Sequence, residues 1–185
     1  NAMSAELVVR HCSPTLAGLK TGNLFSCPCK SREEIQTDVR RLNRLLSPKG
    51  IRIVPLRYAK GKALIYIYRP SKLKKDLAND YACSLLAELG YRQETAELCV
   101  NHLISRLQNS EEFPHEIGLF LGYPPEDVRG FIENKAENCK CVGCWKVYGD
   151  EQKAHKLFNQ YKKCTTVYSR QLSQGRPIER LTVTV

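Results

Sequence analysis

The sequence has no long apolar run and no recognisable leader. No segment approaches the about 18 consecutive apolar residues that cross a bilayer, and no charged-then-apolar stretch follows Met3. Asn1 and Ala2 precede Met3 in the manner of a remnant left by tag cleavage, so we assign residues 3–185 to the fold. At 185 residues and 42% apolar, the chain can bury one sizeable core. We therefore expect one soluble, cytoplasmic domain without a membrane anchor.

Two phosphate-binding motifs are also missing. The sequence contains neither GxxxxGK[ST] nor GxGxxG, which argues against the ordinary nucleotide-binding classes. Cysteine, in contrast, is abundant, with nine residues. An odd number of cysteines and no export signal argue against a disulfide scaffold. Three roles for these cysteines stay open: small apolar packing residues in a reducing cytosol, ligands of a metal site, and redox-active thiols.

Acidic residues are absent from a long basic block. Between Arg40 and Lys75 there are twelve Lys or Arg and no Asp or Glu, in a chain of net charge +10. Coulomb attraction would favour phosphates, nucleotides or nucleic acid there, and a merely solvated face is the alternative.

The first half of the chain predicts strands, helices and a hairpin. We expect a strand over 6–12, a short helix over 13–22 capped by Ser13, a strand over 23–27, and a helix that begins with the capping box of Ser31 and Glu34 and ends near Gly50. Residues 51–58 and 62–68 should then form a β-hairpin around Gly61. Pro55 places the first of these strands at an edge or a bulge, and the second strand, apolar on both faces, should be central.

The second half is mainly helical. Periodic apolar residues predict helices over 71–90, 96–107 and from Asp150 onward, with strands over 145–150 and 180–185. The fold class is therefore α+β: one domain with a mixed or antiparallel central sheet that contains a β-hairpin and is covered by several helices.

A helix-turn-helix-like pair over 114–134 is among these helices. If its second helix entered a major groove, it would present Glu126, Asp127 and Glu133 against the single Arg129, and three carboxylates repel phosphate. Packing of two helices explains the small residues of this segment equally well. We predict that it does not read DNA.

Four stretches together resemble a known family: CSPTLAGLKTGNLF, PHEIGLFLGYPPEDVRGFI, CWKVYGD and GRPIERLTV. They are similar, in order and spacing, to the bacterial domain-of-unknown-function family number 3793, found mainly in clostridia and similar anaerobes. The resemblance covers the chain from about Val8 to Val185. It implies a cytoplasmic protein of an anaerobe, with no assigned activity, cofactor or site residue.

Cys12 is a candidate nucleophile. It is expected at a strand-to-helix junction, where unpaired N–H groups favour a thiolate. His115 would be its general base and Glu116 would orient the histidine. A cysteine that only packs in the core is the alternative.

The segment CKCVGC is a candidate metal site. Cys139, Cys141 and Cys144 have thiolate spacing, and Cys164 or His155 would complete four ligands. Because no second CxxC or HxxxH lies at the usual distance, we expect no metal. Cofactors and oligomeric state stay unknown.

The leading hypothesis is a small anionic ligand bound near residues 12–23. Donors near the expected helix start would come from Thr15, Lys20, Thr21 and Asn23, with Lys60, Lys62 and Arg69 adding charge from the hairpin. A thiol-dependent enzyme that uses Cys12 with His115, and an accessory protein that binds nucleic acid through the basic block, are the two alternatives.

Overall fold

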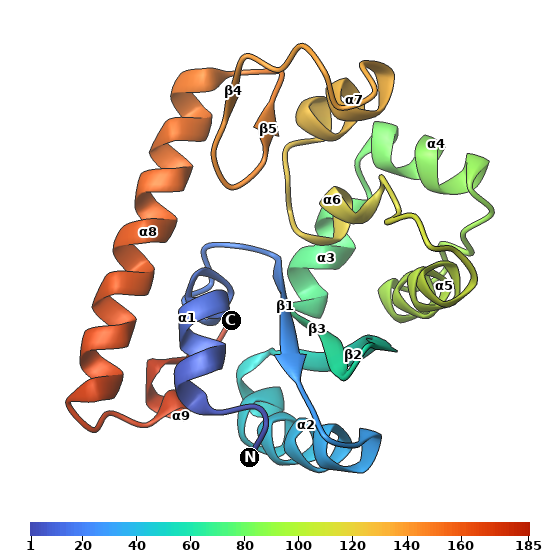
Figure 1. Ribbon diagram of the computed structural model, residues 1–185. Helices are drawn as coiled ribbons and strands as arrows, with labels where there is room; N and C mark the ends of the chain where they lie inside the picture. Colours follow the sequence, from blue (N-terminus) through green and yellow to red (C-terminus); the bar gives the residue numbers. More distant parts are fainter.

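A three-stranded antiparallel sheet lies at the centre of the computed structural model, which describes all 185 residues (Figure 1). Its strands are β1 (Gly22–Pro28), β2 (Arg52–Ala59) and β3 (Lys62–Tyr68), in the order β1-β3-β2. The predicted hairpin is confirmed, with Gly61 in its turn, and β3 is central as expected. The register shifts between Pro55 and Arg57, and β2 is an edge strand, so the proline lies at a bulge on an edge, where a residue without an N–H is tolerated.

Helices cover both faces of this sheet. On one face, Ile65 and Ile67 of β3 pack in a core with α1 (Ala5–Leu16), α2 (Arg32–Leu46) and α9 (Ile178–Leu181). On the other, Tyr66 and Tyr68 pack in a second core with α3 (Pro70–Leu77), α4 (Asp80–Glu88), α5 (Ala96–Asn109), α6 (Ile117–Phe120) and α7 (Pro125–Glu133). The α+β class with a helix-covered antiparallel sheet is thereby confirmed.

The longest helix, α8 (Glu151–Ser173), packs along α1 (Figure 1). Between α7 and α8 lies a small β-hairpin of β4 (Cys141–Val142) and β5 (Lys146–Val147), so the strand expected over 145–150 is only two residues long. A single 3-10 turn, η1 (Ser47–Lys49), follows α2 and ends at Gly50, whose φ of 86° suits a glycine. No helix is both long and apolar enough to span a bilayer.

The strand predicted over 6–12 is wrong, because this segment is the middle of α1. Ser4 caps the helix by accepting from the Leu7 N–H, and Val8, Val9, Cys12 and Leu16 form one buried helical stripe. The predicted helix start at Ser13 therefore lies in the last turn of α1. Pro14 lies inside this helix and has no N–H to donate to the Arg10 carbonyl oxygen, and the Ser13 hydroxyl donates to the Val9 carbonyl oxygen.

Two further elements differ from the sequence prediction. The helix expected over 71–90 is two helices, because the side chain of Asn79 accepts from the N–H groups of Tyr81 and Ala82 and starts α4 anew. The strand expected over 180–185 is wrong: α9 ends at Leu181, and the tail beyond it has no strand partner. That tail is nevertheless fixed, since the Val183 N–H donates to the Leu16 carbonyl oxygen at 2.9 Å.

Candidate functional site

A cleft of about 500 Å³ lies where several parts of the chain meet, and we call it the basic cleft. Its walls come from α1, the loop into β1, the hairpin β4–β5, the segment around α6, and α8. Its lining residues are His11, Pro14, Lys20, Asn23, Leu24, Phe113, Ile117, Leu121, Tyr123, Cys144, Phe158, Tyr161, Lys162 and Thr165. Two lysines and no Asp or Glu are among them, so the cleft combines positive charge with apolar walls.

Lys20 is the charged group most deeply placed in the basic cleft. The residue is only 7% exposed, and its Nζ donates to the Gly22 carbonyl oxygen at 2.8 Å. The same Nζ lies 5.4 Å from the centre of the Tyr123 ring. Burial lowers the pKa of Lys20 to about 8, against smaller opposing effects of Cys12 and Cys144. Lys20, which has no carboxylate partner in the cleft, is therefore mostly charged at neutral pH and loses its charge as the pH rises through about 8.

The loop that carries Lys20 is fixed by backbone contacts. Where α1 ends, the N–H groups of Leu19 and Lys20 both donate to the Pro14 carbonyl oxygen, at 2.9 and 3.1 Å. A Cβ at Gly22 would lie 2.7 Å from the Tyr66 ring and 2.8 Å from the Phe120 carbonyl oxygen. Glycine is therefore required there, because the loop passes directly against the second core.

Asn23 of β1 and Lys162 of α8 also line the basic cleft. The Thr15 hydroxyl donates to the Asn23 side-chain oxygen at 2.7 Å, which leaves the Asn23 amide N–H groups as donors for the cleft. Thr15 itself is fully buried and supports Asn23 from behind. Lys162 is exposed on α8. Of the predicted ligand-binding set, the structure therefore brings Lys20 and Asn23 together in the cleft, with Thr15 as their support.

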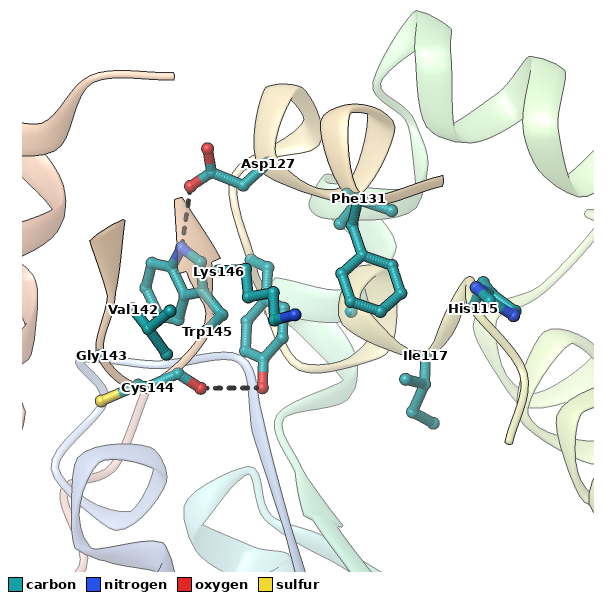
Figure 2. Close-up of a pocket in the computed structure, with 12 residues that line it drawn as sticks. His115, Ile117, Asp127, Phe131, Val142, Gly143, Cys144, Trp145 and Lys146 are labelled. Carbon is teal, nitrogen blue, oxygen red and sulfur yellow. Dashed lines mark hydrogen bonds between the residues drawn. The ribbon is translucent and has the colours of Figure 1, made fainter. Parts of the chain in front are cut away.

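The hairpin β4–β5 is attached to α7 through the buried carboxylate of Asp127. One oxygen accepts from Trp145 Nε1 at 2.8 Å (Figure 2). The other accepts from the N–H groups of Tyr148 and Gly149 at 2.9 and 2.8 Å. At the hairpin tip, a Cβ on Gly143 would overlap the Phe158 ring of α8. These contacts set the wall of the basic cleft to which the hairpin tip belongs.

A second, smaller cavity of about 290 Å³ adjoins the basic cleft, and we call it the aromatic cavity (Figure 2). It shares Tyr123 and Cys144 with the cleft, and the Tyr123 hydroxyl donates to the Cys144 carbonyl oxygen at 3.4 Å. Its other walls include Phe131 and Trp145. Its one lysine, Lys146 of β5, already donates from Nζ to a backbone carbonyl oxygen at 2.6 Å. The aromatic cavity thus extends the apolar surface beside the cleft.

Arg69 does not line the basic cleft, contrary to the prediction that it adds charge to the ligand site. It is fully buried, and its guanidinium donates to the carbonyl oxygens of Thr15, Leu16, Lys49 and Val183 at 2.7–3.0 Å. Two of these carbonyls end α1, where the helix dipole is negative. The residue thereby joins the end of α1 to η1 and to the C-terminal tail.

The helix start expected within residues 12–23, as a place for an anion, is also wrong. The segment holds the C-terminal end of α1, so the helix dipole there does not attract an anion. Thr21 is buried and its hydroxyl donates to Asp76. The positive charge of Lys20, and not a set of helix N–H groups, is what this segment offers.

Lys60 and Lys62 lie away from the cleft. Along β3, Lys62 pairs with Pro28 whereas Ile67 pairs with Asn23, five residues further on. At roughly 3.3 Å per residue this separates the hairpin turn from Asn23 by about 16 Å. Both lysines are exposed at the turn and are not part of the site that contains Lys20.

Cys12 lies in the core and not at a strand-to-helix junction. It is fully buried on α1, and burial raises the pKa of its thiol far above the ordinary value, with a smaller opposing effect of Lys20. It lines neither the basic cleft nor the aromatic cavity. The structure therefore gives no support to a thiolate at this position.

His115 and Glu116 do not form the expected pair. His115 is exposed and lines the aromatic cavity, 5.7 Å from Phe131 between ring centres. Glu116 is buried, accepts from the Tyr91 hydroxyl at 2.9 Å and is ion-paired with Arg106. Its carboxylate is thus occupied by partners other than His115.

The cysteines of CKCVGC are dispersed. All nine cysteines are free, and no group of three or more His, Cys, Asp or Glu side chains is arranged to hold a metal ion. Cys139 and Cys141 lie at the base of the hairpin β4–β5, and Cys144 is exposed at its tip. Of the two residues considered as a fourth ligand, Cys164 is buried on α8 and His155 is exposed on the same helix.

The helix pair over 114–134 is present as α6 and α7. A Cβ on Gly118 would approach Tyr123 and Val128 to 2.8 and 2.9 Å, so this glycine serves close helix packing. The exposed side of α7 carries both Glu133 and Arg129, which form an ion pair. Asp127, expected on that exposed side, is instead buried against the hairpin β4–β5.

Sequence reasoning missed the distant half of the basic cleft. Tyr123, Tyr161 and Lys162 follow Lys20 by more than a hundred positions and carry no local motif. The one available signal is Cys144, whose spacing from the neighbouring cysteines suggests only a metal ligand.

Comparison with known proteins gives a family and no further relative. A family model described as a protein of unknown function, DUF3793, matches residues 8–182. Neither the curated proteins nor the solved structures include a significant match to the chain.

Proposed function

The chain belongs to the DUF3793 family, and we propose, from its basic cleft, that it binds a small organic anion with an apolar body. The observation that carries the proposal is Lys20, an almost fully buried lysine in a cleft without a carboxylate. A bare inorganic ion would make no favourable contact with the apolar walls. A carboxylate on a hydrocarbon or aromatic group would contact both the charge of Lys20 and the apolar walls.

The charge of Lys20 gives binding a pH dependence. An anion beside its Nζ favours the ammonium form, so binding should raise the pKa from about 8 and take up a fraction of a proton. Affinity should consequently fall as the pH rises through about 8. Lys162 and the Asn23 amide, which also line the cleft, would add a second charge and a donor.

Isothermal titration calorimetry with phenyllactate tests the proposal. This probe carries one carboxylate on an aromatic body. We expect Lys20→Met to weaken binding by at least about tenfold, because a charge-assisted hydrogen bond contributes about 1.5–3 kcal/mol. The matched control is Lys163→Met, which removes an exposed lysine of α8 outside the cleft lining and should leave affinity unchanged. Equal affinity of all three proteins, or no binding to the wild-type chain, would overturn the proposal.

We also propose that the protein is cytoplasmic and bacterial, as the resemblance to an anaerobe family implies. Nine free cysteines support a reducing compartment. The acidic residues on the exposed side of α7, Glu126 and Glu133, support the further proposal that this helix does not read DNA.

A further inference from the structure

We infer that Lys20 forms an imine with 2-oxo acids that carry an apolar side chain. The inference rests on the proposed function and names its ligand class. Two features of the basic cleft point to this chemistry: the amine of Lys20 is enclosed by apolar and aromatic groups, and no carboxylate lines the cleft to hold it as a permanent ion pair.

The hydrogen bonding of Lys20 leaves the lone pair of its neutral amine free to attack a carbonyl carbon. Its Nζ makes one hydrogen bond within the protein, to the Gly22 carbonyl oxygen at 2.8 Å. A neutral amine can keep that bond with one of its two hydrogens while its lone pair points elsewhere. Because the Gly22 backbone is pinned against Tyr66 and Phe120, the amine has a fixed anchor.

Burial increases the fraction of Lys20 that is in the neutral amine form. With a pKa of about 8, Lys20 has a far larger uncharged fraction near neutral pH than an exposed lysine. Relative to an ordinary lysine pKa of about 10.4, the uncharged fraction near pH 7 is larger by roughly a hundredfold. Only the uncharged amine attacks a carbonyl carbon.

The reaction needs no oxidant or reductant. The lone pair of Nζ adds to the ketone carbon of the 2-oxo acid, and a proton moves from nitrogen to the former carbonyl oxygen to give a carbinolamine. The second N–H proton and the hydroxyl group then leave as one water molecule, and a carbon–nitrogen double bond remains. The imine nitrogen becomes charged by taking up a proton from solvent.

The cleft walls match the rest of such a ligand. The carboxylate next to the ketone would meet Lys162 and the Asn23 amide, and the side chain would lie against Leu121, Phe158 and Tyr161. A 2-oxo acid with an aromatic side chain therefore fits better than one with a second carboxylate, because apolar groups make up most of the wall that remains.

Reductive trapping tests the inference. The full chain is incubated with phenylpyruvate and cyanoborohydride near neutral pH, and adducts are located by intact mass and peptide mapping. We expect one adduct, on Lys20, formed roughly a hundredfold faster than on a surface lysine. Lys20→Arg keeps a positive charge but cannot form an imine, so its adduct should be absent. Lys163→Arg is the matched control and should react like the wild type.

The result separates this inference from the proposed function. Calorimetric binding of phenyllactate, which has a hydroxyl in place of the ketone, together with no Lys20 adduct from phenylpyruvate would overturn the imine alone. Adducts spread over surface lysines and unchanged in Lys20→Arg would overturn it as well. Absence of binding by both acids would overturn the proposed function and the imine together.

Discussion

The Nζ of Lys20 lies 2.8 Å from the carbonyl oxygen of Gly22, and no carboxylate in the basic cleft balances its charge. This arrangement costs folding free energy, because a pKa that falls from 10.5 to about 8 corresponds to about 3 kcal/mol. Lys20 is thus held where a neutral side chain would be more stable.

We therefore predict that Lys20→Met stabilises the fold by about 2 kcal/mol near neutral pH, since the lost hydrogen bond offsets part of the desolvation cost. Between about pH 8 and the ordinary lysine value of 10.5, the unfolded chain binds more protons at this lysine than the folded one. The stability of the wild type should consequently rise relative to the variant across that window. Urea unfolding of both proteins at several pH values measures the difference, and a difference independent of pH would contradict the prediction.

The buried Arg69 provides a second prediction, on stability alone. Arg69→Met leaves four carbonyl oxygens without their donor and should destabilise the protein by at least about 3 kcal/mol. Amide exchange at Val183 should quicken, since its N–H donates to Leu16 beside the lost guanidinium. The exposed Arg44 of α2 is the control, and Arg44→Met should change stability little. Equal effects of the two substitutions would show that the C-terminal tail does not depend on Arg69.

A third prediction concerns the attachment of the hairpin β4–β5. Asp127→Asn retains only one acceptor oxygen for three donors, so it should cost about 2 kcal/mol and loosen the hairpin. Trp145, the single tryptophan, is 6% exposed and reports this directly by a red shift of its fluorescence. Phenyllactate affinity should fall with it, because Cys144 belongs to the cleft wall. Glu126→Gln, at an exposed neighbour, should change neither signal; if Asp127→Asn also left both unchanged, the hairpin would not depend on this carboxylate.

Local sequence patterns predicted the helices and strands whose ends are marked by capping, turn or bulge residues. The capping box of Ser31 and Glu34, the glycine turn at Gly61 and the proline bulge at Pro55 are all decided within a few residues, and each lies where expected. The pattern failed at α1, since its adjacent valines favour a strand locally and Pro14 suggests a helix start, whereas packing of a buried stripe decides for a helix.

The site was predictable only in part for a related reason. Lys20 and Asn23 could be predicted because they lie three positions apart in the sequence, where the chain enters β1. The other cleft residues, on the hairpin β4–β5 and α8, approach through long-range contacts that no local pattern encodes. Arg69 shows the opposite error: it was expected to add charge to the ligand site, but it is fully buried and donates to carbonyl oxygens of three segments that are distant in the sequence.

The ionisation of Lys20, followed by NMR of the protein with 13C-labelled lysine, tests the central claim most directly. We expect the Lys20 Cε signal to titrate with a pKa of about 8 in the free protein, and saturating phenyllactate to raise this pKa while the exposed lysines stay unchanged. A Lys20 that titrates like the exposed lysines and does not respond to phenyllactate would contradict the claim that this buried amine is the anion-binding group.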